Sequence, residues 1–367
     1  MPYLRVPLTN PKPDIEAFCK VIRRQMIPKR PPLVEFAISD EANPELRGNF
    51  YKLNATYKEG SREFKEIWAK LSIELWLSFG YDYIHLGGGQ LKFERKSRIT
   101  GDTASKGNDE RSWTEEGKGP ISSWEDFEKY PWPSVRDVDL YAYEVASKNL
   151  PDGMGMFARP TFGFFELPMD VLMGYETLSY AIYDQPDLIE AVFNKAGELI
   201  YEFYRKLAGL DKLTGFFQGD DMGFKTATLV PPDFLRKHVL PWHKKTAKLA
   251  HDNGLLYLLH SCGQLEAIMD DLIDDVEIDA KHSYEDAITP VTEFKKKYGK
   301  RITILGGVDM DILCRAPEDK LRAYLRNILD VCSQGGGYAF GSGNSIANYV
   351  PVKNYKLMIE EGLNYRK

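Results

Sequence analysis

The chain has 367 residues, of which 43% are hydrophobic and 28% charged, a composition typical of a folded globular protein and not of a disordered one. Its 48 Lys and Arg residues against 54 Asp and Glu residues give a formal net charge of −6. Because no long basic run occurs, nucleic acid is not an expected partner. No window of about 18 apolar residues and no signal-like start is present, so we expect a cytoplasmic protein without membrane contact. The four cysteines are too few and too scattered for a disulfide framework.

The chain starts with residues 1–30, an extension that contains an amphipathic stretch at 14–26. We expect this extension to pack across the bottom or the side of the main domain. From residue 31 onward, short apolar runs alternate with stretches of helical periodicity. The runs that we predict as strands are 32–37, 81–86, 154–159, 214–219, 255–260, 278–282, 301–306 and 337–341.

Amphipathic helices are predicted between these strands. The first begins after Ser61 and ends before Gly80, and later ones end before Gly209 and Gly254. The predicted helices are 61–79, 186–207, 231–253, 264–273, 291–298, 318–331 and 351–362. Strict alternation of strands and helices requires a parallel sheet, and eight such units predict a (β/α)8 TIM barrel. We therefore expect residues 31–367 to form one barrel domain.

One long insertion interrupts this alternation. Residues 87–120, after the second predicted strand, are polar and rich in glycine. The alternating pattern at 91–100 and the aromatic Trp113 suggest hairpins folded over the barrel mouth as a lid. A surface excursion without a function is the alternative.

The strongest motif is LLYLLHSCGQ at 255–264, at the end of a predicted strand. Active sites of βα barrels lie at the carboxyl ends of the strands. His260 and Cys262 are two residues apart and so lie on the same side of the chain, and Gly263 permits a tight turn after them. An imidazole and a thiolate placed in this way suit Zn²⁺. The alternative is a hydrogen-bonded pocket histidine next to a small buried cysteine.

Four carboxylates are candidates for catalysis. Asp220 and Asp221 end a predicted strand, and two adjacent charges there favour either a cation ligand or a general acid of raised pKa, unless they are a helix cap and a solvated neighbour. Glu166 follows a run of aromatic residues, where desolvation would raise its pKa for proton donation or metal ligation, unless it reaches water at the rim. Asp309 can bind substrate or cap the next helix.

The remaining polar residues near strand ends are candidates for substrate binding. Aromatic residues beyond the third predicted strand can form a pocket wall, although core packing explains them equally well. The substrate-binding candidates are Glu35, His85, Phe162, Phe165, His282 and Asn344. His238, His243 and His251 share one predicted helix, and we expect them at the surface or in helix packing.

Four segments together resemble the uroporphyrinogen decarboxylase superfamily, and within it the branch of zinc- and corrinoid-dependent methyltransferases. They are HSCG at 260–263, GDDMG at 219–223, GGVD at 306–309 and GSGNSIANYVPVKNY at 341–355. The resemblance spans residues 155–365 and implies a (β/α)8 barrel. The decarboxylases resemble one another in an Arg-Gln-Ala-Gly-Arg-Tyr segment that grips the porphyrinogen carboxylates, and the corresponding region here reads EFAISDEANPELRGNF.

In the methyltransferase branch, the residues matching His260 and Cys262 bind zinc together with a third ligand, which is a cysteine on the last strand. Asn344 stands where that cysteine would fall. Either Glu166, Asp220 or Asp221 supplies the third ligand, or the zinc site has been lost. The resemblance implies an O-demethylase component that moves a methyl group from a small methylated substrate, with an aromatic methoxy compound preferred, to cob(I)alamin on a partner corrinoid protein. The alternatives are a metal-free uroporphyrinogen decarboxylase and a non-catalytic tetrapyrrole-binding barrel; a homodimer is a further possibility.

Overall fold

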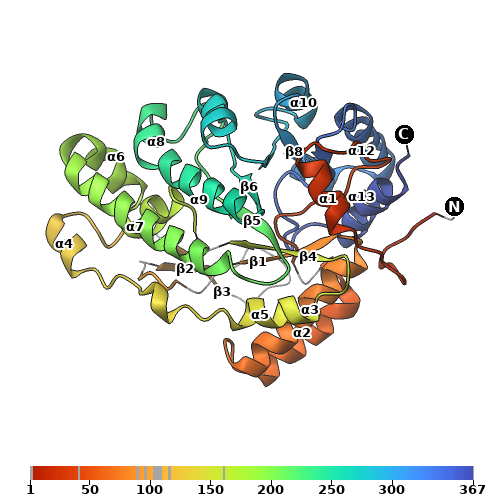
Figure 1. Cartoon of the computed structure of the whole chain (residues 1–367), viewed down its shortest axis with the longest axis horizontal. Coiled ribbons are helices and arrows are strands. Elements are labelled where there is room, and N and C mark those ends of the chain that lie inside the picture. Colours follow the sequence, from red (N-terminus) through yellow and green to blue (C-terminus); the bar gives the residue numbers. More distant parts are fainter. Residues whose placement is uncertain are drawn as a thin grey trace.

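Helices surround a central parallel sheet in the computed structural model, and both chain ends lie on the same side of the molecule (Figure 1). Within the described part of the chain, no helix is long and apolar enough to cross a membrane. The described residues are 3–39, 42–87, 91–94, 97–101, 110–114, 117–159 and 162–366.

The sheet has seven parallel strands that follow one another in chain order, and it is curled. The strands are β1 (Tyr83–Gly87), β4 (Gly155–Arg159), β5 (Leu213–Gly219), β6 (Leu256–His260), β7 (Ala280–His282), β8 (Thr303–Leu305) and β9 (Tyr338–Ala339). Each overlaps a predicted strand, and no bound differs from the predicted one by more than two residues. Their residues are almost all buried because helices cover one face of the sheet and the other face turns inward.

The first predicted strand, 32–37, is not a regular strand. It forms isolated parallel bridges from Leu33 to Phe340 and from Ile38 to Ile346, beside β9. Toward β1 the contact runs through a side chain: the Tyr83 hydroxyl accepts a hydrogen bond from Glu35 N (2.9 Å) and donates one to Glu35 O (2.7 Å). Between this segment and β1, a tyrosine hydroxyl thus stands where a regular sheet would have backbone hydrogen bonds.

Five predicted helices are confirmed almost residue for residue. They are α3 (Arg62–Ser78), α7 (Pro186–Leu207), α10 (Val291–Tyr298), α12 (Glu318–Cys332) and α13 (Val352–Asn364). The predicted helix 231–253 is divided into α8 (Pro232–His238) and α9 (Leu240–Asp252), because Pro241 has no N–H to continue the helical hydrogen bonds. The predicted helix 264–273 is replaced by a 3₁₀ turn, η4 (Glu266–Ile268), and a π turn, η5 (Asp271–Asp275).

Several further elements were not predicted from periodicity. They are α2 (Pro44–Thr56), α4 (Trp124–Lys129), η2 (Val135–Asp137), α5 (Tyr141–Asn149), η3 (Leu167–Met173), α6 (Tyr175–Asp184) and α11 (Met310–Arg315). Helices α2, α3 and α5 pack side by side along one edge of the molecule (Figure 1).

Helix α1 (Ile15–Ile22) packs at the amino-terminal ends of β1 and β4. Ile15 N donates to Gly153 O at 2.8 Å, just before β4 begins. The buried ring of Phe18 lies 5.2 Å from that of Tyr83 and 5.9 Å from that of Phe157. The opposite ends of the strands, where the polar candidates lie, are therefore free of this helix.

The predicted hairpin in the insertion is present as two antiparallel strands, β2 (Ser97–Gly101) and β3 (Glu110–Thr114). Ser97 pairs with Thr114 and Gly101 with Glu110. Much of the rest of the predicted lid, including 88–90 and 102–109, lies outside the described residues.

Candidate metal centre

Three of the predicted site residues meet at the carboxyl ends of β5 and β6. One possible ligand atom each from Asp221, His260 and Cys262 lies within 4.8 Å of the other two. His260 Nε2 is 3.7 Å from Asp221 Oδ1 and 3.5 Å from Cys262 Sγ. The register explains the meeting, since Gly219 at the end of β5 pairs with His260 at the end of β6.

The turn after β6 fixes Cys262 against Asp221. Cys262 N donates a hydrogen bond of 2.8 Å to Asp221 Oδ1. Gly263 follows with a φ of 80°, and a Cβ atom there would lie 2.2 Å from the carbonyl carbon of Gly223. Only glycine fits both the backbone angle and the close approach of the two loops.

A chain of hydrogen bonds determines which nitrogen of His260 carries the proton. His282 Nε2 lies 3.0 Å from Ser342 O, and a carbonyl oxygen can only accept, so this nitrogen carries the proton of His282. Burial lowers the pKa of His282 to about 3, which keeps its ring neutral and its Nδ1 unprotonated. His260 Nδ1, 2.8 Å away, must then be the donor.

The proton on Nδ1 determines the state of the other ring nitrogen of His260, Nε2. Burial lowers the pKa of His260 well below its ordinary value, so this ring is neutral as well. With its proton on Nδ1, His260 presents the Nε2 lone pair to Asp221 and Cys262. A histidine whose other nitrogen donates to a fixed partner is the usual arrangement of a metal ligand.

Glu35 supports the same chain from behind. Its fully buried carboxyl group accepts hydrogen bonds from Ser342 N at 2.8 Å and from Ser342 Oγ at 2.5 Å. Burial raises the pKa of Glu35 to about 8. We expected Glu35 and His282 to bind substrate, but both are buried and their polar atoms hold Ser342 and His260 in place, so their observed partners are protein groups.

The electrostatic setting opposes negative charge unless a cation is bound. Burial, and then the charge of Asp221, raise the pKa of the Cys262 thiol to about 12. Burial also raises the pKa of Asp221. A divalent cation reverses this balance because it favours a thiolate and a carboxylate as ligands. One sulfur, one imidazole nitrogen and one carboxylate oxygen form a donor set that fits Zn²⁺.

Two neutral groups contact the Cys262 sulfur. Asn344 Nδ2 donates toward Sγ at 3.4 Å, and Ser283 Oγ lies 3.5 Å from it. Asn344 therefore lies beside the three candidate ligands, near where the resemblance placed a cysteine as the third zinc ligand. Here its side chain donates a hydrogen bond to the Cys262 sulfur.

The other predicted carboxylates have different roles. Asp220 is fully buried, and its oxygens accept from Phe165 N and Glu166 N at 3.0 Å and bind His243 Nε2 at 2.8 Å. It thus holds the loop after β4 in place. His243, expected at the surface or in helix packing, is fully buried, with Tyr257 OH on its other nitrogen at 2.7 Å.

Glu166 and Asp309 lie in different surroundings. Burial raises the pKa of Glu166 well above its ordinary value, and the nearby charge of Asp221 adds to the effect, so Glu166 belongs to the surroundings of the cluster. Asp309 caps α11, since its Oδ1 accepts from Asp311 N at 2.9 Å and from Ile312 N at 3.2 Å. The capping alternative therefore describes Asp309.

The aromatic residues after β4 pack mainly into the core. Phe165 is fully buried, with its ring 6.5 Å from that of Phe193 on α7, so it is not a pocket wall. Phe162 is only partly buried against the same core. Phe164, behind them, lies 4.9 Å from the His243 ring. Their apolar side chains fill the space between the loop and the outer helices.

Two residues near the cluster were missed by the sequence analysis. The ring of Phe36 stacks on that of His260, with centroids 4.2 Å apart and planes at 19°. The Arg159 guanidinium, at the end of β4, lies 4.7 Å from the centre of the Phe36 ring. His85 Nδ1 lies 2.5 Å from Phe36 O, so the predicted His85 fixes this segment. The strand-end position of Arg159 was the signal that could have identified it.

A pocket of about 780 Å³ opens beside Phe36, between β1 and helices α2 and α3. Its acidic and basic lining groups among the described residues are Glu59, His85 and Arg159. Its aromatic lining consists of Phe36, Phe50, Tyr57, Phe64, Trp68 and Trp76. A pocket of this size and lining suits a small, flat, mainly apolar molecule.

Comparison with known proteins shows which family the chain belongs to. The model of the family described as "Uroporphyrinogen decarboxylase (URO-D)" matches residues 119–365. The chain belongs to the URO-D family. A uroporphyrinogen decarboxylase of Coxiella burnetii is 23% identical over 264 residues, which are 68% of this chain and 69% of that protein. One from Actinobacillus succinogenes is 31% identical over 77 residues, which are 21% of this chain and 22% of that protein.

A solved structure described as a methyltransferase from Methanosarcina mazei has the same fold. The two superpose with a TM-score of 0.66 at 17% identity, over 96% of this chain and all of the other. The membership expected from HSCG and the accompanying segments is thus confirmed. The URO-D match contains the three candidate ligands, whereas Glu35, Phe36 and most of the aromatic pocket lie before its first residue.

Proposed function

We propose that the chain is a zinc-dependent methyltransferase of the URO-D family. In this proposal it moves a methyl group from a small methoxylated aromatic substrate to cob(I)alamin on a partner corrinoid protein. The observation that carries the proposal is the cluster of Asp221, His260 and Cys262, in which His260 Nε2 presents a lone pair to the other two groups. The description of the Methanosarcina mazei structure as a methyltransferase supports it.

The proposal extends to the closure of the barrel and to the insertion. We infer that residues 31–367 form one closed (β/α)8 barrel, in which 32–38 takes the eighth strand position through its bridges to Phe340 and Ile346. The side-chain contact of Tyr83 with Glu35 supports closure on the other side. The insertion 87–120 would serve as the lid, near which the corrinoid protein docks.

Asp221, His260 and Cys262 would hold the zinc ion. Bound zinc supplies a Lewis acid that stabilises developing negative charge on the oxygen of the leaving phenol. Burial raises the pKa of Glu166 well above its ordinary value and so favours the protonated form, which makes Glu166 the candidate to protonate that oxygen. In the overall reaction the C–O bond would break with its electron pair on oxygen, which would take up a proton, and the partner's cob(I)alamin would supply the electron pair of the new bond to the methyl carbon.

The aromatic pocket supports the choice of substrate class. Phe36 lines the pocket and its ring stacks on that of His260, so the Phe36 side chain separates a ring bound in the pocket from the metal cluster. The Arg159 guanidinium is the described cation that lines this pocket, and it could orient a polar substituent of the substrate.

A methyl-transfer assay tests the proposal. Zinc-loaded protein is incubated with cob(I)alamin and a series of methoxybenzenes, and loss of the cob(I)alamin absorbance is followed together with phenol release by mass spectrometry. We expect turnover in the wild type, none in Cys262→Ser or His260→Ala, and a mild effect of Asn344→Ala. Wild-type rates in either of the first two variants would overturn the metal mechanism.

Uroporphyrinogen decarboxylation is the second candidate, and the names of the curated relatives favour it. A porphyrinogen with eight carboxylates needs several cations, whereas the described lining of the aromatic pocket includes one arginine. Incubation of the protein with uroporphyrinogen, with and without a chelator, distinguishes the candidates. Coproporphyrinogen formation in the chelated sample would establish the decarboxylase, and tight porphyrinogen binding without turnover in any assay would indicate the non-catalytic barrel.

A further inference from the structure

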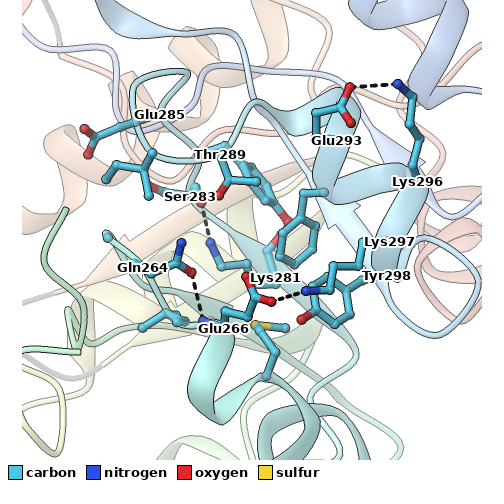
Figure 2. A pocket seen from close by; sticks show the side chains of 16 residues that line it. Gln264, Glu266, Lys281, Ser283, Glu285, Thr289, Glu293, Lys296, Lys297 and Tyr298 are labelled. Atoms are coloured by element: carbon cyan, nitrogen blue, oxygen red, sulfur yellow. Dashed lines mark hydrogen bonds and ion pairs between the residues drawn. The ribbon is translucent and has the colours of Figure 1, made fainter. Parts of the chain in front are cut away.

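A second pocket, of about 410 Å³, lies between the segment after β6 and the segment formed by β7, its loop and α10 (Figure 2). None of the three candidate zinc ligands lines it. Its apolar wall is formed by Leu265, Met269, Tyr284, Ile288, Phe294 and Tyr298. The proposed methyl transfer assigns no role to this pocket.

Lys281 lies at the inner end of this pocket. It is the middle residue of β7 and is 3% exposed; since strand side chains alternate, it faces away from its neighbour His282. Its ammonium group donates to Ser283 O and lies 4.3 Å from the centre of the Tyr284 ring and 5.5 Å from that of the Phe294 ring. One of its three N–H donors is thus used by a protein oxygen.

The other two lysines of the pocket are already paired. Lys296 Nζ lies 2.7 Å from Glu293, and Lys297 Nζ forms an ion pair with Glu266. Figure 2 shows the Glu285 carboxylate directed away from Lys281. Within the described residues, Lys281 therefore has no carboxylate at ion-pair distance although it is the most buried of the three lysines.

A buried ammonium group without an anion at ion-pair distance is costly, because it has given up water and only the more distant Asp221 and Glu285 carboxylates offset its charge. We propose that this pocket binds a small carboxylate with an apolar or aromatic body, and that the carboxylate pairs with Lys281 Nζ. The rings of Tyr284, Phe294 and Tyr298 would contact the body of the ligand, and the volume is that of a small-molecule site.

The position of the pocket connects such a ligand with the metal cluster. Ser283 accepts the hydrogen bond from Lys281 through its carbonyl oxygen, and its hydroxyl lies 3.5 Å from Cys262 Sγ. Burial lowers the pKa of Lys281 to about 8, so the ammonium form still dominates at neutral pH. A bound anion would keep this positive charge next to the candidate zinc ligands.

Calorimetric titration of the full chain with benzoate, and with benzamide as its neutral isostere, tests the pocket. The protein is kept free of zinc so that benzoate cannot bind to a metal ion. We expect benzoate to bind the wild type, with an affinity at least about tenfold lower in Lys281→Met, whereas benzamide binding is the same in both proteins. Lys296→Met, at the same pocket, should bind benzoate like the wild type. In Arg159→Met, which removes the cation of the aromatic pocket, the benzoate binding that depends on Lys281 should remain.

Three outcomes would overturn the proposal: no benzoate binding to the wild type at millimolar concentration, equal binding to Lys281→Met, or loss of binding in Arg159→Met. A second measurement covers the case in which Lys281→Met does not fold. In wild-type protein carrying ¹³C-methyl methionine, benzoate should shift the Met269 resonance, assigned with Met269→Leu. An unchanged Met269 resonance at saturating benzoate would also contradict the proposal. Because zinc and methyl transfer play no part in these measurements, they are independent of the proposed function.

Discussion

At the scale of single residues, the structure distinguishes groups that look equivalent in the sequence. Asp220 and Asp221 are adjacent, yet the first holds the backbone of Phe165 and Glu166 and the second faces His260. The position of His260 and Cys262 was predictable because both follow one buried strand. The supporting role of His282 was not, because it depends on the pairing of β6 with β7 and on a contact with Ser342 sixty residues later in the chain.

The first prediction concerns His282. In His282→Phe the ring shape is kept, but His260 Nδ1 loses its acceptor and the Nε2 lone pair is no longer fixed. We expect zinc affinity to fall about 10- to 100-fold, measured by competition with a chromogenic chelator. His282→Asn, whose amide oxygen can accept from His260, should recover part of the loss; equal affinity in wild type and His282→Phe would contradict the role.

The second prediction concerns Glu35, whose pKa burial raises from 4.5 to about 8. The folded protein therefore holds this proton more tightly than the unfolded chain does. The resulting stability is fully present below about pH 4.5 and is lost as the pH rises through about 8. In Glu35→Gln, which keeps the acceptor for Ser342 N, the pH dependence of the unfolding free energy over this window should decrease by an amount on the order of a few kcal/mol. Urea denaturation across the window measures it, and an unchanged slope would contradict the buried, protonated carboxyl.

At the scale of elements, helical periodicity identified the helices that pack on the sheet and missed a helix with a weak amphipathic pattern. Helices α3, α7, α10, α12 and α13 have an apolar face toward the strands and were predicted almost to the residue. Helix α2 has only a weak amphipathic pattern and was not predicted. Segment 32–37 has the composition of a strand, but its contacts with β1 run through the Tyr83 side chain, which no local pattern reveals.

Helix α11 provides the element-scale prediction. Asp309→Ala removes the acceptor for Asp311 N and Ile312 N at the start of this helix. We expect a loss of about 0.5–2 kcal/mol in unfolding free energy, with zinc content unchanged, measured by denaturant titration and elemental analysis. If stability were unchanged but methyl transfer were abolished, Asp309 would have a catalytic role after all.

At the scale of the whole molecule, the candidate metal ligands and the packing of helix α1 lie at opposite ends of the strands. The carboxyl ends of β5 and β6 bear the candidate ligands, and α1 packs at the amino-terminal ends of β1 and β4. The URO-D match covers the ligands but not most of the aromatic pocket, which residues 36–87 largely form. The three candidate ligands therefore lie in the matched part of the chain, while most of the proposed substrate pocket lies outside it.

This separation predicts the effect of a cavity far from the cluster. Phe18 is 1% exposed and packs against Tyr83 and Phe157. Phe18→Ala should lower the unfolding free energy by about 3–5 kcal/mol, measured by chemical denaturation, while the zinc content of the folded protein remains that of the wild type. Loss of zinc from folded Phe18→Ala protein would show that the two ends are coupled.

The metal content of the purified protein tests the central claim most directly. Elemental mass spectrometry is applied to the wild type, Cys262→Ser, Asp221→Asn and, as a matched carboxylate control, Glu166→Gln. We expect about one zinc per chain in the wild type and in Glu166→Gln, and loss of zinc in the other two variants. A wild type without zinc after growth in zinc-replete medium, or a Cys262→Ser protein that keeps it, would contradict a zinc centre formed by Asp221, His260 and Cys262.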